Sequence, residues 1–221
     1  MDYKVVEIFT SINGEGQFAG ELSVFVRFAG CNLNCGYCDT AWANQENTEY
    51  TSMSAEEIVQ RIQATGILRT TLTGGEPLLQ TGIRELLKEL IRIPELLIEI
   101  ETNGSIDISP YQKLSDRISY TLDYKLPGSG MEASMCLTNY ETVTKGDTVK
   151  FVISNREDME KAEKIIRTYN LQNRCHVYLS PVYGRINAAV IVDYMKEHTL
   201  NGVRLQLQLH KYIWNPEQRG V

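Results

Sequence analysis

Ala29-Gly-Cys-Asn-Leu-Asn-Cys-Gly-Tyr-Cys-Asp-Thr40 is the most informative stretch of the sequence, because it sets Cys31, Cys35 and Cys38 in a C-x3-C-x2-C spacing. This spacing lets one short loop wrap a single metal centre. A structural zinc site needs four ligands, usually as two separated pairs, and ferredoxin runs supply every cysteine that their clusters need. Three cysteines instead predict a [4Fe–4S] cluster with one iron free of protein ligands. The alternative is three unrelated cysteines buried as small hydrophobic residues.

The cysteine spacing, with Tyr37 just before the third cysteine, resembles the motif of the radical S-adenosylmethionine (SAM) superfamily. The resemblance implies that the open iron binds the amino and carboxylate groups of SAM. An electron from a flavodoxin- or ferredoxin-type donor then splits SAM, and the resulting 5′-deoxyadenosyl radical takes a hydrogen atom from the substrate.

The composition of the 221 residues is typical of a soluble globular protein, with 43% hydrophobic and 23% charged residues. This length suits a single α/β domain, so we expect one domain over residues 1–221. No apolar run is long enough to span a membrane and no export signal is present. With Cys136 and Cys175 read as reduced, the chain is predicted to be cytoplasmic. The net charge of −6 argues against a nucleic-acid partner and favours a small-molecule substrate.

Apolar runs rich in β-formers alternate with amphipathic stretches along the chain. Helices are predicted after Ser54, which fits a capping box with Glu57, and over Gly82–Arg92 and Arg156–Tyr169, whereas Ser134–Thr144 has no clear pattern. The alternation predicts an α/β fold with mostly parallel strands, a partial (β/α)6 barrel whose active-site residues gather at the carboxyl ends of the strands. The predicted strands are Val24–Phe28, Thr70–Leu72, Leu97–Ile100, Ser119–Leu122, Val149–Ile153, Val177–Leu179 and Val203–Leu207.

Polar residues follow several of the predicted strands. In Thr73-Gly-Gly-Glu-Pro77 two glycines let the backbone approach a ligand, and Glu76 adds a carboxylate. Alone this is a tight turn, but beside the cysteine motif it resembles the GGE motif that meets the α-amino group of SAM. Asp123 and Lys125 can supply a hydrogen-bond acceptor and a donor to the zwitterionic amino-acid group and the ribose of SAM. Alternatively, they form a surface ion pair that contributes little to stability. The resemblance implies these SAM-binding residues: Tyr37, Cys38, Asp39, Gly74, Gly75, Glu76, Asn103, Asp123, Tyr124, Lys125 and Ser180.

The N-terminal stretch Glu7-Ile-Phe-Thr-Ser-Ile-Asn-Gly-Glu-Gly-Gln17, followed by Val24-Phe-Val-Arg-Phe-Ala-Gly-Cys31, resembles the 7-carboxy-7-deazaguanine synthase (QueE) group. The resemblance covers nearly the whole chain. It implies a pterin- or deazaguanine-like base, a Mg2+ ion on Thr40 and a homodimer. Arg27 would pair with a substrate carboxylate or hydroxyl, with a structural Glu as an equal alternative. The implied substrate-binding residues are Ile12, Asn13, Gly14, Glu15, Arg27, Thr73, His210 and Val221.

Two departures from the synthase pattern leave the reaction open. Asp123-Tyr-Lys125 stands where the synthases read Ser-Pro-Lys, and the insert Pro127–Met131 resembles radical SAM activating enzymes. The chain therefore resembles a clostridial-type branch that includes queuine lyases, which break a C–N bond in the side arm of queuine. The synthases instead act on 6-carboxytetrahydropterin. The departures lie beside the SAM residues and favour the lyase narrowly, with the synthase as the alternative.

A glycyl-radical activating enzyme and an iron–sulfur electron carrier are weaker alternatives. The Asp-x-Lys feature suits an activating enzyme, but such an enzyme needs an open groove for a peptide and gives Asn13–Gly16 no role. An electron carrier has no use for the GGEP turn or for a missing fourth cluster ligand. The scattered histidines, His176, His198 and His210, form no H-E-x-x-H pair.

Overall fold

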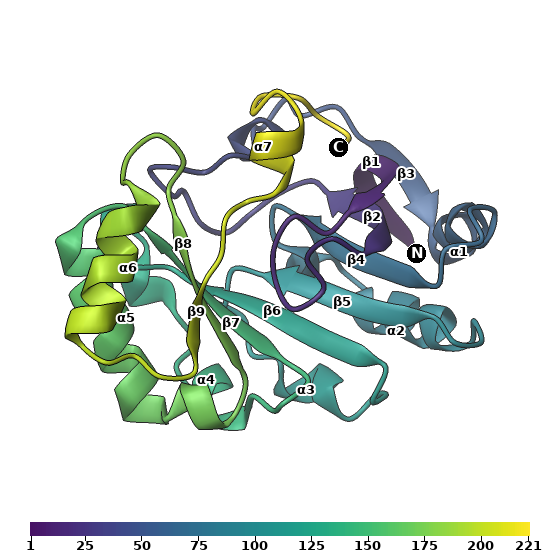
Figure 1. The fold of residues 1–221 in the computed structure, drawn as a ribbon. Coiled ribbons are helices and arrows are strands. Elements are labelled where there is room, and N and C mark those ends of the chain that lie inside the picture. The colour runs from purple at the N-terminus through teal and green to yellow at the C-terminus, as the bar shows by residue number, and fades with distance from the viewer.

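The computed structural model describes residues 1–221 and shows one curved sheet of nine strands (Figure 1). The strand order is β3-β1-β2-β4-β5-β6-β7-β8-β9. All neighbours from β2 to β9 are parallel, whereas β1 pairs antiparallel with both β2 and β3. The predicted partial barrel with mostly parallel strands is therefore confirmed. The strands are β1 (Asp2–Ile12), β2 (Leu22–Phe28), β3 (Thr51–Ser54), β4 (Arg69–Gly74), β5 (Leu97–Thr102), β6 (Ile118–Tyr124), β7 (Thr148–Ile153), β8 (His176–Pro181) and β9 (Val203–Leu205).

Helices connect the parallel strands and cover the outer face of the curved sheet (Figure 1). The capping box predicted at Ser54 forms, since its Oγ accepts from the Glu57 N–H at 3.2 Å and its own N–H donates to Glu57 Oε2 at 2.7 Å. None of the helices has the length and apolar character that a membrane crossing requires. The helices are α1 (Ala55–Gln63), α2 (Ile83–Ile91), α3 (Ser109–Gln112), α4 (Asn139–Thr142), α5 (Arg156–Tyr169), α6 (Ala188–Glu197) and α7 (His210–Ile213).

The two faces of the sheet differ in chemistry, because successive side chains of a strand point to opposite sides. On β5, Ile98 and Ile100 are buried in the hydrophobic core under the helices. Glu99 points to the inner face, where its Oε1 accepts from the Thr121 hydroxyl of β6 at 2.7 Å. The inner face of the barrel is therefore polar and suited to bind charged ligands rather than to pack as an apolar core.

The prediction from the sequence missed two strands and made a third too long. β1 carries the charged residues Lys4 and Glu7 and a register irregularity between Val5 and Glu7, so it lacks a regular alternation. β3 has only four residues. The strand predicted over Val203–Leu207 ends at Leu205. The next residue, Gln206, still donates its N–H to the Leu179 carbonyl of β8 at 2.9 Å, and its side chain bonds to the N-terminal loop. The unpatterned segment Ser134–Thr144 contains the single-turn helix α4.

Candidate active site

The three cysteines lie on the loop after β2, on the side of the sheet where the parallel strands end (Figure 1). All three are unpaired and partly exposed. Two N–H groups face Cys31 Sγ, the Leu33 backbone at 3.4 Å and the Asn103 amide at 3.5 Å, as donors do around iron–sulfur ligands. No group of three or more His, Cys, Asp or Glu side chains lies close enough to hold one metal ion. The thiols are thus too far apart to bind one metal ion. A [4Fe–4S] cluster binds each cysteine to a different iron, so its ligands lie further apart than those of a single ion.

The glycine turn after β4 packs backbone to backbone against the cysteine loop. A Cβ on Gly75 would lie 1.8 Å from the Gly30 carbonyl oxygen, and one on Gly74 (φ +130°) would lie 2.3 Å from the Phe28 carbonyl oxygen. The Glu76 N–H donates to the Gly30 carbonyl at 2.8 Å. Only glycine fits at these two positions, so the GGE turn and the cysteine loop have a fixed relative position.

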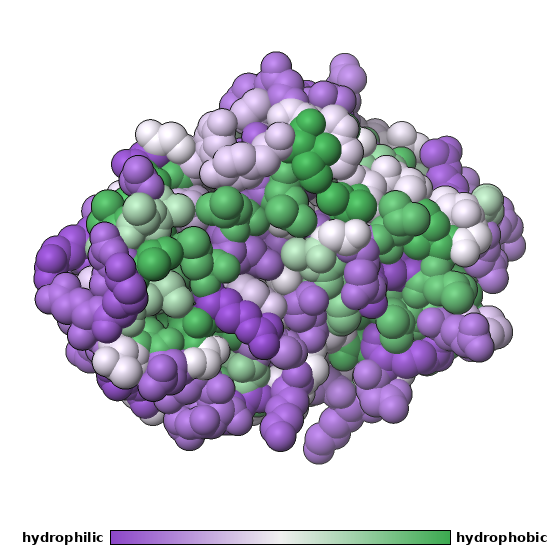
Figure 2. Space-filling model, viewed as in Figure 1, coloured by the Kyte–Doolittle hydropathy of each residue, from purple (hydrophilic) through white to green (hydrophobic).

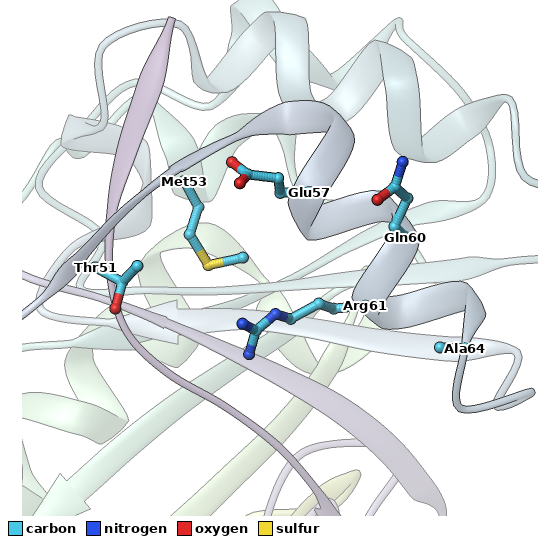
Figure 3. Close-up of a pocket in the computed structure, with 6 residues that line it drawn as sticks. All are labelled: Thr51, Met53, Glu57, Gln60, Arg61 and Ala64. Atoms are coloured by element: carbon cyan, nitrogen blue, oxygen red, sulfur yellow. The ribbon is translucent and has the colours of Figure 1, made fainter.

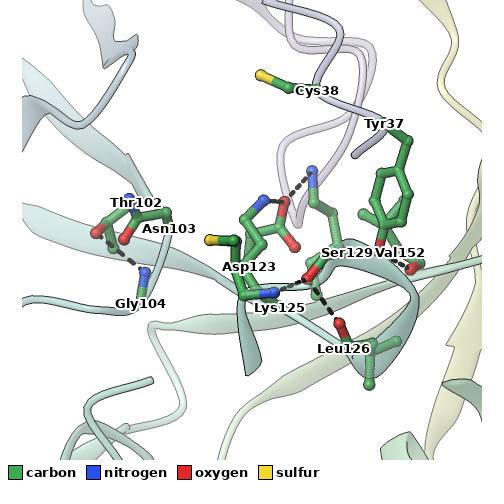
Figure 4. Close-up of polar contacts among 12 residues, drawn as sticks. Tyr37, Cys38, Thr102, Asn103, Gly104, Asp123, Lys125, Leu126, Ser129 and Val152 are labelled. Atoms are coloured by element: carbon green, nitrogen blue, oxygen red, sulfur yellow. Dashed lines mark hydrogen bonds and ion pairs between the residues drawn. The ribbon is translucent and has the colours of Figure 1, made fainter. Parts of the chain in front are cut away.

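The Glu76 carboxylate points into the protein and is fully buried. It accepts hydrogen bonds from the Leu78 N–H at 3.0 Å, the Thr102 hydroxyl at 2.9 Å and the Asn103 N–H at 2.7 Å. Burial raises its pKa, and these donors lower it in part. Figure 4 shows Thr102 and Asn103 at the end of β5. Glu76 therefore holds Asn103 in position, and the Asn103 amide in turn reaches Asn32 and Cys31.

A row of charged side chains crosses the inner face below the cysteine loop. Lys125 Nζ lies 2.7 Å from Asp123 Oδ2 (Figure 4). Lys150, on the neighbouring β7, lies 3.9 Å from the same Asp123 oxygen and 3.0 Å from Glu15 Oε2. The Gln208 amide donates to that Glu15 oxygen at 3.1 Å. The predicted SAM residues and the predicted base-binding loop are therefore joined through Lys150.

The loop between β1 and β2 meets the segment that follows β9. The Gly14 carbonyl accepts from the Leu209 N–H at 3.0 Å, and a Cβ on Gly14 would lie 2.3 Å from His210 Nδ1. Gln206 pairs twice with the backbone of Gly16: its Oε1 accepts from the N–H at 2.7 Å and its Nε2 donates to the carbonyl at 2.9 Å. Residues predicted from opposite ends of the chain, Gly14 and His210, thus lie side by side.

Arg27 has a protein partner in the structure. Its Nε donates to Glu7 Oε1 at 2.7 Å across the β1–β2 pair, with both side chains largely buried. The guanidinium also lies over the rings of Phe9 and Trp42, 5.8 Å from each centroid. The structural Glu that the sequence left as an alternative is therefore present. Thr73 is the register neighbour of Arg27 on β4, so both face the same part of the barrel.

Three further predicted residues surround the cysteine loop. The Tyr37 hydroxyl donates to the Val152 carbonyl at 3.1 Å (Figure 4). Thr40 Oγ1 lies 3.5 Å from the Gly74 carbonyl oxygen and 3.7 Å from Cys38 Sγ, which places it between the two motifs. Asp39 is half exposed, with its Oδ2 3.9 Å from Lys211 Nζ.

Four further residues that were predicted to bind SAM or the substrate lie outside the contacts described above. The Tyr124 side chain is buried in the core with its ring 5.5 Å from that of Phe151, so only its backbone can reach the inner face. Ser180 is fully buried on β8 with no partner for its Oγ. Ile12 ends β1. Val221 ends the chain above the sheet (Figure 1), and no backbone hydrogen bond holds it.

Lys150 and Gln208 contact the predicted residue Glu15, and Gln206 contacts its neighbour Gly16, but none of the three was predicted. Lys150 is the one charged residue of β7, and a charge inside an otherwise apolar strand could have indicated it. The two glutamines follow β9 and give no local signal, because their role depends on the distant loop that they contact.

A small pocket elsewhere on the surface has no link to these residues. It has a volume of about 260 Å3 and lies between β3 and α1 (Figure 3). Its lining residues are Thr51, Met53, Glu57, Gln60, Arg61 and Ala64. None of them was predicted to bind a ligand. Figure 2 shows hydrophilic side chains along much of the rim of the molecule, with apolar side chains between them. Tyr212 and Ile213 of α7 are exposed.

The inner face fits a cluster and a polar ligand such as SAM. The buried atoms there without a hydrogen-bond partner include Asn13 Nδ2, Glu15 Oε1, Asp123 Oδ1 and Ser180 Oγ. Buried polar atoms without a partner are costly, so these are positions at which ligand donors and acceptors can bind. Burial also raises the pKa of Cys35 to about 11, and iron bound to the sulfur would stabilise the thiolate.

Comparisons with known proteins agree with this geometry. The family model of the Radical SAM superfamily matches residues 25–124. A 7-carboxy-7-deazaguanine synthase of Clostridium acetobutylicum is 53% identical over 221 residues, which is 100% of both chains. One from Chlorobaculum tepidum is 37% identical over 98% of this chain and 96% of its own. The crystal structure of QueE from Escherichia coli superimposes with a TM-score of 0.74 over 94% of each chain, and at 20% identity this likeness concerns the fold.

Proposed function

Since the chain belongs to the 7-carboxy-7-deazaguanine synthase family of radical SAM enzymes, we propose that it is such a synthase in queuosine biosynthesis, with 6-carboxytetrahydropterin as substrate. The observation that carries the proposal is the identity to the Clostridium acetobutylicum synthase, which extends over the full length of both proteins. The reaction is that of a carbon–nitrogen lyase, in which the pterin ring contracts and ammonia leaves.

Cys31, Cys35 and Cys38 would hold the [4Fe–4S] cluster, and the inner face beside them would hold SAM. When bound, these groups supply the 5′-deoxyadenosyl radical that abstracts hydrogen from the substrate. The residues of the chain bind SAM and the substrate and orient them. The free Asp123 Oδ1 and Ser180 Oγ are suited to the ammonium or ribose hydroxyl donors of SAM.

The base would lie against the loop between β1 and β2. The free Glu15 Oε1 can accept from the N–H groups of a pterin edge, and the free Asn13 amide can donate to its carbonyl oxygen. Arg27 would meet the substrate carboxylate while retaining Glu7 on its other side, which keeps the buried guanidinium paired. We propose Thr40 as a Mg2+ ligand on the resemblance alone.

Queuine lyase is a second candidate. The departure at Asp123 and Lys125 favoured it narrowly, and that ion pair is present at 2.7 Å. The names of the relatives support the synthase instead. Both reactions place a related heterocycle in one pocket, so the distinction is a matter for the assay.

A homodimer, a flavodoxin- or ferredoxin-type electron donor and a cytoplasmic location stay predictions. That residues 1–221 form one domain is likewise a proposal, supported by the single sheet that takes in all nine strands. A glycyl-radical activating role has no support among the relatives.

The test is an anaerobic assay of the cluster-loaded protein with SAM and dithionite, offered 6-carboxytetrahydropterin or queuine in parallel. We expect 5′-deoxyadenosine and 7-carboxy-7-deazaguanine from the pterin, measured by mass spectrometry. Turnover of queuine alone would establish the lyase and reject the synthase. The Cys31→Ala, Cys35→Ala and Cys38→Ala variants should each lose SAM cleavage, and cleavage retained in any of them would refute the cluster assignment.

A further inference from the structure

Lys150 is a buried cation at the centre of the inner face. Its side chain is 12% exposed and projects from β7, whose other residues are uncharged. An ammonium group in such surroundings needs anionic partners, because burying it alone is very costly. Two carboxylates supply them: Glu15 Oε2 at 3.0 Å and Asp123 Oδ2 at 3.9 Å. Lys150 therefore bridges two elements that are far apart in the sequence.

Each of these carboxylates uses only one of its oxygens within the protein. Glu15 Oε2 accepts from Lys150 and Gln208, and Asp123 Oδ2 faces Lys150 and Lys125. The second oxygens, Glu15 Oε1 and Asp123 Oδ1, are buried without any donor. Lys150 thus orders both side chains from one side and leaves the other oxygen of each for a ligand.

The two free oxygens belong to different ligand sites. Glu15 lies in the loop proposed to hold the base, and Asp123 lies at the strand end proposed to hold SAM. We propose that Lys150 is a positioning residue that couples the two sites, so that binding of the base strengthens binding of SAM. The inference rests on the proposed function, because that function assigns Glu15 to the base and Asp123 to SAM.

The coupling has a simple physical origin. The first ligand to bind fixes one carboxylate, and the bridge through Lys150 then restricts the other, so the second ligand finds its partner already ordered. Without the cation, Glu15, Asp123 and the nearby Glu101 would repel one another and move apart or take up protons. By linkage, the base must gain the same factor in affinity from SAM as SAM gains from the base.

The experiment measures SAM binding to the cluster-loaded, full-length protein by anaerobic calorimetry, with no reductant so that SAM is not cleaved. In the wild type, saturating 6-carboxytetrahydropterin should lower the Kd of SAM at least fivefold. In Lys150→Met, the two Kd values should agree within twofold. Lys150→Arg should restore most of the coupling, and Lys145→Met, at an exposed lysine, should behave as the wild type.

Each other outcome has a distinct meaning. If Lys150→Met keeps the wild-type coupling, the role of Lys150 is overturned while the proposed function stands. If the wild type binds no 6-carboxytetrahydropterin, the proposed function fails and the coupling falls with it. Should Lys150→Met load less iron than the wild type, Lys150→Gln removes the same cation with a polar side chain and must show the same loss of coupling.

Discussion

Gly14 and His210 fit against each other so closely that a Cβ on Gly14 would lie 2.3 Å from Nδ1 of the imidazole. The neighbouring Leu209 N–H donates to the Gly14 carbonyl at 3.0 Å. The absence of a side chain at position 14 therefore sets how near the C-terminal segment approaches the loop between β1 and β2, which we propose binds the base.

The Gly14→Ala substitution should displace His210 and weaken binding of the base. Position 14 has no left-handed backbone, so the methyl group acts through this contact rather than through strain. We expect KM for the base to rise about tenfold, which corresponds to roughly 1.4 kcal/mol. In a Gly14→Ala/His210→Ala double variant, the additional effect of Gly14→Ala should be much smaller than in the wild type, as steady-state kinetics would reveal. Equal effects in both backgrounds would mean that the contact does not matter.

Gln206 should act as a clamp on the same loop, since its amide makes two hydrogen bonds to the Gly16 backbone, at 2.7 Å and 2.9 Å. Loss of two hydrogen bonds costs about 1–3 kcal/mol, so Gln206→Ala should raise KM for the base by about 5- to 150-fold. SAM cleavage in the absence of base should change little. Gln60→Ala, at an exposed position of α1, provides the control, and an equal effect of both variants would argue against the clamp.

Glu76→Gln should destabilise the protein. The carboxylate oxygens accept separately from the Leu78 N–H and the Asn103 N–H, and an amide has one accepting oxygen, so one backbone donor must face an NH2 group. The expected loss is about 1–3 kcal/mol, or about 3–10 °C in the melting temperature. Thermal unfolding followed by circular dichroism measures it. Glu85→Gln, on the exposed side of α2, should melt within about 1 °C of the wild type. An equal loss of stability in Glu85→Gln would show that the effect of Glu76→Gln does not come from its buried hydrogen bonds.

Glu99 should make the stability depend on pH. Burial and the neighbouring Glu101 carboxyl raise the pKa of Glu99 from 4.5 to about 8. Because the folded-state pKa is the higher one, the folded protein holds the proton more tightly. The contribution of Glu99 is therefore fully present below about pH 4.5 and is lost as the pH rises through about 8.

The Glu99→Gln variant lacks this titration and keeps an oxygen for the Thr121 hydroxyl. Its melting temperature relative to the wild type should rise between pH 5 and pH 8.5, by an amount that corresponds to about 4 kcal/mol at most. A difference that stays constant over this range would show that Glu99 titrates at its ordinary pKa.

The sequence predicted the parts of the fold and site that depend on local pattern. The apolar runs of β2 and β4–β8 and the capping box at Ser54 were visible in single stretches, as were the cysteine loop and the GGE turn. β1 was missed because its charges and its irregular register hide the alternation.

Properties that depend on tertiary contacts could not be predicted. The turn containing Glu76 is compatible with a carboxylate facing either a ligand or the protein, and only the packed structure shows three protein donors around it. The pairings of Lys150 with Glu15 and of Gln206 with Gly16 join residues 135 and 190 positions apart. No local periodicity encodes such partners.

The separation of 190 residues between Gln206 and Gly16 also orders events during synthesis. The cysteine loop is synthesised early, whereas the contacts of the loop between β1 and β2 with Gln206 and Leu209 form only after the final segment has left the ribosome. A prematurely terminated product that retains the three cysteines would lack the contacts from Gln206 and Leu209, so the proposed recognition of the base depends on complete translation.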